Sequence, residues 1–96
     1  MKPGRRRKNG YFKRLLDAPA PISVTVEHRV PFSDIDGIGI VWHGRYPVYF
    51  EKASAELGRQ CGLAYLDYLE ANLRAPMVQF HVDHFNPLFL DEEFTI

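Results

Sequence analysis

One acidic residue in a glycine-containing loop is the strongest candidate for chemistry in this sequence. Asp36 lies in the stretch 31–50, whose residue types predict a strand end, a loop with Gly37 and Gly39, and a helix start near Pro47. Glycine permits positive φ and close packing, and proline suits the first helical turn, where its missing N–H would have no partner. A carboxylate facing the free N–H groups of a helix start offers a base or nucleophile beside a place for developing negative charge, which acyl transfer requires.

Both acids near this loop also have ordinary structural explanations. Aspartate beside glycine commonly bonds its own backbone in a turn, and spacing alone leaves Asp36 open between that role and catalysis. Glu51 follows within the apolar half of the expected helix. Buried acids are usually paired, so Arg29, Arg45 or a backbone group are its expected partners.

The loop does not fit two familiar ligand-binding patterns. Counted from Asp34 as in a calcium loop, the twelfth position is Arg45, where a bidentate glutamate is required. In a dinucleotide fingerprint the third glycine would fall at Trp42. His81 and His84 are three residues apart, and on a strand they would point to opposite faces. We therefore predict neither a metal site nor a cofactor.

Around the loop, hydrophobic periodicity predicts a mixed α+β domain. Apolar residues alternate with polar ones along 24–32, which predicts a strand with His28 and Phe32 on its covered face. An apolar stripe at three- and four-residue steps from Tyr46 to Cys61 predicts a helix that ends at Gly62, with Cys61 in the core. A second helix is expected within 63–72. Alternation over 77–85 predicts another strand, and 94–96 would open a third.

Charge and composition divide the chain into an arm and a body. Residues 1–14 hold seven bases and no acid, which leaves five bases against twelve acids in the remainder. The prediction is a basic flexible arm with a Pro-rich linker over 1–21, followed by the domain over 22–96. The single cysteine, Cys61, and the lack of a signal peptide or long apolar run favour a cytoplasmic protein without a membrane span. The arm alone favours nucleic-acid binding only weakly.

The combined motif resembles a known enzyme family. Asp36, Gly39, Val41, His43 and Tyr46, followed by Tyr-Phe-Glu at 49–51, are similar to the 4-hydroxybenzoyl-CoA thioesterase family of hotdog-fold acyl-CoA thioesterases. The similarity extends over 24–96. It implies a long central helix wrapped by an antiparallel sheet, with two protomers joined into a homodimer or homotetramer. Family members usually carry further strands, so we expect the C-terminal part of the fold to be missing.

The resemblance also implies roles for individual residues. Asp36 would be the catalytic base or nucleophile, and the backbone N–H of His43 would polarise the thioester carbonyl, while the His43 side chain would orient water or contact the thioester. The resemblance assigns substrate binding to Val41, Trp42, Tyr46 and Glu51. The expected substrate is an acyl-CoA or, as the form of 42–46 resembles a subgroup associated with acyl-chain synthesis, an acyl carrier protein.

Two other functions remain open on the sequence. A hotdog module that binds acyl groups without catalysis, as a regulator or scaffold partner, would leave Asp36 as a turn former. A hotdog dehydratase or hydratase would use His43 and Glu51 and would leave Asp36 without a task.

Overall fold

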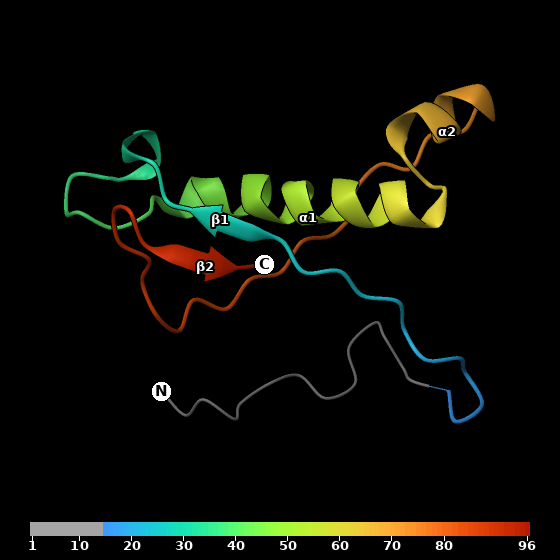
Figure 1. Cartoon of the computed structure of the whole chain (residues 1–96), viewed down its shortest axis with the longest axis horizontal. Coiled ribbons are helices and arrows are strands. Elements are labelled where there is room, and N and C mark those ends of the chain that lie inside the picture. The colour runs from blue at the N-terminus through green and yellow to red at the C-terminus, as the bar shows by residue number, and fades with distance from the viewer. Residues whose placement is uncertain (1–14) are drawn as a thin grey trace.

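The longest element is a helix at the centre of the molecule. The computed structural model describes residues 15–96, and its helix α1 spans Tyr46–Cys61 (Figure 1). Pro47 lies in its first turn, and Gly62 ends it with a φ of 75°. This left-handed conformation is open to glycine at little cost. Both the length and the end of the predicted helix are confirmed.

A two-stranded antiparallel sheet lies along α1. Strand β1, Glu27–Arg29, pairs with β2, Glu93–Thr95, and His28 faces Phe94 (Figure 1). Backbone bonds continue the pairing beyond these strands, where Val26 and Ile96 exchange two bonds of 2.9 and 2.8 Å. The predicted third strand is thus present and pairs with the first.

The alternation predicted for the first strand is largely confirmed. Val24, Val26 and His28 are half-buried and Val30 is buried, whereas the residues between them are exposed. Phe32 was wrongly placed on the covered face. It begins the short 3₁₀ helix η1, Phe32–Asp34, where the chain leaves the sheet, and its side chain is 81% exposed.

The core lies where α1 meets the sheet. Val30, Val41 and Tyr49 are buried together. The Tyr49 ring lies 5.0 Å from His28 and 5.2 Å from Phe94, measured between ring centroids. Aromatic pairs at these separations add to the burial of apolar area, so the first half of α1 is fixed on the sheet.

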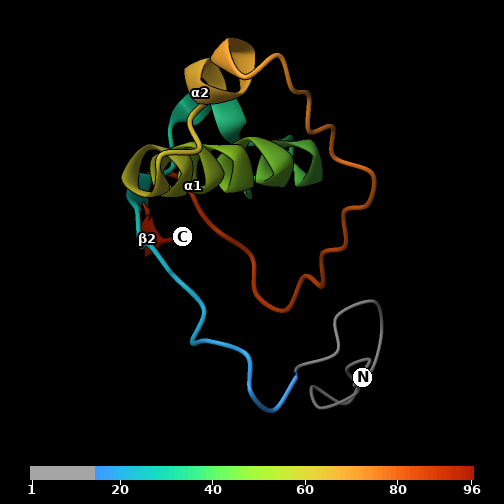
Figure 2. The same ribbon diagram turned by 90° about the vertical axis from the view of Figure 1, so that its right-hand side faces the viewer.

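The predicted strand over 77–85 is wrong for this structure. The segment is extended but has no ladder partner among residues 15–96, and Val78 is 91% exposed. Figure 2 shows it as a wide arc beside α1. An alternating pattern can form a strand only where another strand pairs with it, and sequence periodicity does not reveal whether that neighbour is there.

The segment after α1 is short and open to solvent. Helix α2 spans Tyr65–Glu70, which confirms the second helix. Cys61 is exposed, so its predicted place in the core is wrong. In the described part of the chain, no helix is both long enough and apolar enough to cross a bilayer.

Candidate active site

The loop that carries Asp36 is a tight hairpin closed by its own backbone. Ile35 bridges Val41, and the Asp36 N–H donates to the Ile40 carbonyl at 2.8 Å. Gly39 has a φ of 88°, as expected for a glycine in a tight turn, whereas Gly37 does not have a positive φ. The short loop holds residue 36 close to the point where the chain turns toward α1.

The Asp36 side chain is only partly occupied by the turn. Its Oδ1 accepts the N–H of Ile38 at 2.9 Å and that of Ile40 at 3.4 Å. The turn-forming role considered from the sequence is therefore present. Oδ2 of Asp36 accepts no hydrogen bond from residues 15–96, so one carboxylate oxygen is available for other chemistry while the other holds the side chain in place.

A single turn of 3₁₀ helix forms the head of α1. This turn, η2, spans His43–Arg45 and begins with the Arg45 N–H bonded to the Trp42 carbonyl at 2.9 Å. Among the residues described, the backbone N–H of His43 has no acceptor. It is one of the unsatisfied donors that every helix start presents, and the helix dipole adds partial positive charge nearby.

One cavity brings the loop and the helix head together. It has a volume of about 270 Å³ and is lined by Asp36, Ile40, Val41, His43, Tyr46, His84, Phe85, Asn86 and Pro87. The far wall is held by the loop itself, since the Val41 N–H donates to the Leu88 carbonyl at 2.9 Å and Ile40 bridges Phe89. Asp36 and His43, whose main-chain N–H has no acceptor among the described residues, therefore border the same space.

Two of the four predicted substrate-binding residues line this cavity. They are Val41, which is mostly buried, and Tyr46. Burial, with a smaller contribution from the Glu92 charge, raises the pKa of Tyr46, so its hydroxyl stays protonated at neutral pH.

The other two predicted residues lie outside the lining. The Trp42 side chain is 49% exposed, and its ring packs 5.2 Å from the His43 ring. Glu51 is exposed and accepts the Tyr65 hydroxyl at 3.2 Å. The arginine partners expected for Glu51 were wrong, because Arg29 pairs with Glu93 and Arg45 pairs with Asp34.

The sequence reasoning missed the contacts of a buried carboxylate, Asp34, at the start of the loop. Asp34 is 8% exposed; its Oδ2 accepts the Tyr49 hydroxyl at 2.7 Å, and its Oδ1 lies 3.2 Å from Nε of Arg45. Burial first, and then the hydrogen bond to Asp34, raise the pKa of Tyr49 well above its ordinary value. The signal available in the sequence was a second acid two residues before Asp36, which was weighed only as a calcium ligand.

His84 was considered in the sequence only as a metal ligand. Its ring lies edge-on to the Tyr46 ring, with 4.8 Å between centroids, and it lines the same cavity as Asp36. No spacing rule connects residues 36 and 84, so the sequence held no signal for their meeting. Residues 15–96 contain no group of three or more potential metal ligands.

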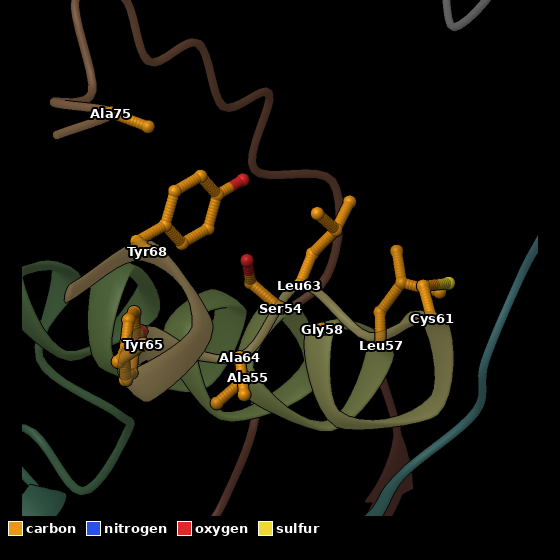
Figure 3. Close-up of a pocket in the computed structure, with 10 residues that line it drawn as sticks. All are labelled: Ser54, Ala55, Leu57, Gly58, Cys61, Leu63, Ala64, Tyr65, Tyr68 and Ala75. Atoms are coloured by element: carbon orange, nitrogen blue, oxygen red, sulfur yellow. The ribbon is translucent and has the colours of Figure 1, made fainter. Parts of the chain in front are cut away.

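A second cavity lies between α2 and the end of α1. It also measures about 270 Å³ and is lined mainly by apolar groups, with the Ser54 and Tyr68 hydroxyls among its lining groups (Figure 3). It contains neither a carboxylate nor an imidazole. The cavity at the head of α1 is thus the better candidate for chemistry.

Comparisons with known proteins agree with the family that the sequence motif resembles. A sequence model described as the thioesterase superfamily matches residues 38–96, a range that includes His43 and Tyr46 and begins two residues after Asp36. A curated protein of Aquifex aeolicus (strain VF5) named "Putative esterase" is 34% identical over 68 residues, which are 71% of this chain and 53% of that protein.

A solved structure shows the same fold. The crystal structure of a hypothetical protein from Aquifex aeolicus superimposes with a TM-score of 0.69 at 32% identity, over 74% of this chain and 58% of that chain. The chain thus spans a little over half the length of these relatives. The fold is the predicted α+β hotdog fold, with its long helix beside an antiparallel sheet. The chain belongs to the thioesterase superfamily.

Proposed function

We propose that this protein hydrolyses an acyl thioester to a free acid and a thiol, with Asp36 as the reacting carboxylate. The observation that carries the proposal is the cavity at the head of α1, which Asp36 and His43 both line. Membership of the thioesterase superfamily supports the reaction class.

Two routes fit this arrangement. In the first, Asp36 takes a proton from water, the hydroxide oxygen bonds to the carbonyl carbon, and the C–S bond breaks to release the thiolate. In the second, a carboxylate oxygen of Asp36 attacks the carbonyl carbon, the thiolate leaves, and water hydrolyses the mixed anhydride. Because Oδ1 is held by the loop amides, Oδ2 is the oxygen that acts in either route.

The main-chain N–H of His43 is the proposed donor to the carbonyl oxygen. Negative charge develops on that oxygen in both routes, and a fixed donor stabilises it more than the neutral carbonyl. The positive end of the α1 dipole lies nearby and contributes in the same sense. His43 also lines the cavity, and in this proposal its imidazole orients the water or contacts the thioester.

The proposed substrate is an acyl-CoA or an acylated acyl carrier protein, and we propose a homodimer or homotetramer in the cytoplasm. Exposed apolar side chains support association, among them Val48 and Phe50 on α1 and Val78 on the arc. Most of the basic arm predicted over 1–21 lies outside the described residues.

The donor role of residue 43 can be tested by two substitutions at that position. His43→Ala removes the imidazole and keeps the N–H, whereas His43→Pro removes the N–H as well. Trp42 has a ψ of 135°, which suits a residue before proline, and 3₁₀ φ values are within proline's range. Loss of such a donor typically costs about 10²–10³ in rate.

We therefore expect His43→Pro to release thiol from acyl-CoA about 10²-fold more slowly than His43→Ala. Circular dichroism checks that both are folded. Equal rates for the two variants would remove the main-chain donor from the proposal, and no thiol release by the parent protein from any acyl donor of a panel would overturn the proposed reaction.

Label found in Asp36 after a single turnover in H₂¹⁸O identifies the nucleophile route. The base route places one ¹⁸O in the product acid and none in Asp36. The nucleophile route, with water attacking the carboxyl carbon of the aspartate in the anhydride, leaves ¹⁸O in Asp36, which mass spectrometry of the peptide detects.

The rival function is acyl binding without catalysis. The turn formed by Asp36 favours this rival, because two hydrogen bonds from backbone amides to its Oδ1 explain an aspartate at position 36 without any reaction. Calorimetric binding of acyl-CoA without thiol release, unchanged in Asp36→Asn, would establish the rival.

A further inference from the structure

We infer that Asp34 is a positioning residue for this reaction: its buried carboxylate joins the head of α1 to the loop that carries Asp36. The inference rests on the proposed function, because it assigns Asp34 a task in the same site. Asp34 does not line the cavity, so it acts through its neighbours.

The side chain of Asp34 binds two separate parts of the helix head. Oδ2 accepts the hydroxyl of Tyr49, a residue in the first turn of α1, at 2.7 Å. Oδ1 lies 3.2 Å from Nε of Arg45, the last residue of η2, and 3.4 Å from the Ser33 hydroxyl. Each carboxylate oxygen thus holds a different element of the helix head.

The backbone of the same residue closes the loop. The Trp42 N–H donates to the Asp34 carbonyl at 2.9 Å, and the Ile35–Val41 bridge follows directly. Residue 34 therefore stands at the base of the hairpin, with Asp36 two residues after it and His43 next to its partner Trp42. The separation between the Asp36 carboxylate and the His43 N–H is set across this junction.

Burial makes these contacts effective. Asp34 is 8% exposed and Tyr49 is 3% exposed, so water competes little for their hydrogen bond. The raised pKa of Tyr49 keeps its phenol protonated and hence a donor to the carboxylate. A buried carboxylate left without these partners would rearrange, and a shift of about 1 Å between reacting groups can cost about 10² in rate.

Tyr49→Phe is the mildest test, and the chain offers a matched control. It removes one hydroxyl from Asp34 and keeps the ring in the core. Tyr65→Phe removes the corresponding hydroxyl from Glu51. This contact is exposed, and neither residue lines the cavity at the head of α1. We expect kcat for thiol release to fall about tenfold or more in Tyr49→Phe, with KM little changed, and to stay at the parent value in Tyr65→Phe.

Asp34→Asn tests the carboxylate itself through a double-mutant cycle. If Asp34 acts through Asp36, Asp34→Asn lowers kcat in the parent background and has little further effect in the Asp36→Asn background. A role confined to stability would lower the rate by the same factor in both backgrounds. Should Asp34→Asn fail to fold, the same cycle is made with Tyr49→Phe.

Amide hydrogen exchange provides a readout that needs no activity. Positioning predicts faster exchange in Tyr49→Phe at Ile38 and Ile40, which bond the Asp36 side chain, and at Trp42, relative to amides in the second half of α1. A parent protein without activity that shows this local change would refute the proposed function and leave only the structural link between Asp34 and the loop standing. An active parent with additive rate effects and uniform exchange changes would overturn the positioning role alone.

Discussion

Replacing Arg45 with methionine tests the electrostatic junction under the loop. Arg45→Met keeps the apolar length of the side chain and removes the charge that lies 3.2 Å from Oδ1 of Asp34. The Asp34 side chain is 10% exposed and that of Arg45 is 40% exposed. Breaking a fully buried pair costs about 3–5 kcal/mol, and an exposed pair is worth about 0–1 kcal/mol. For this half-exposed arginine we expect a loss of about 2 kcal/mol.

Urea unfolding followed by circular dichroism measures this loss. With a slope of about 1 kcal/mol per M for a small domain, the midpoint should fall by about 2 M at unchanged slope. Arg59→Met is the control, because Arg59 pairs with Glu56 at 2.6 Å, with side chains 60% and 37% exposed. Its midpoint should fall by less than half as much. Equal shifts for the two variants would refute the claim that the Asp34 junction is buried and stabilising.

Two further predictions concern stability. Burial, and then the Lys52 ammonium, lower the pKa of His28 below 6.5, so on acidification the unfolded state binds a proton before the folded state does. The free energy of unfolding should therefore stay constant above pH 6.5 and decline as the pH falls from 6.5 toward the folded-state pKa. His28→Gln should remove this decline, and His81→Gln should keep it. Gly39→Ala should lower the free energy of unfolding by about 1–2 kcal/mol, because residue 39 has a φ of 88°. Gly37→Ala has the same open space around its Cβ position and should lie within about 0.5 kcal/mol of the parent. Equal losses for the two variants in thermal melts would contradict a cost set by the φ of residue 39.

The sequence predicted the elements whose signals are local. The stripe from Tyr46 to Cys61 and the glycine at 62 define α1 as observed. Alternation identified the covered face of β1 and the strand that begins near residue 94, whereas the pairing of these two strands, far apart in the sequence, was not predicted. The loop with Asp36 was recognisable from its aspartate and glycines, and it does meet His43 and Tyr46 at one cavity.

The parts that failed depend on contacts between distant residues. A strand over 77–85 requires a neighbour, and its side chains meet no ladder among the described residues. Glu51 finds Tyr65 fourteen residues away instead of an arginine. The bond between Asp34 and Tyr49, and the approach of His84 to Tyr46, follow from packing in three dimensions that no periodicity expresses.

The rate of thiol release by Asp36→Asn, compared with Asp83→Asn, tests the central claim most directly. Both substitutions replace a carboxylate with an amide of the same shape, and Asp83 is exposed on the arc beside His81. With acyl-CoA as donor and both variants shown to be folded, we predict that kcat/KM falls by at least about 10³-fold in Asp36→Asn and stays near the parent value in Asp83→Asn. An Asp36→Asn protein as fast as the parent would contradict a chemical role for this carboxylate.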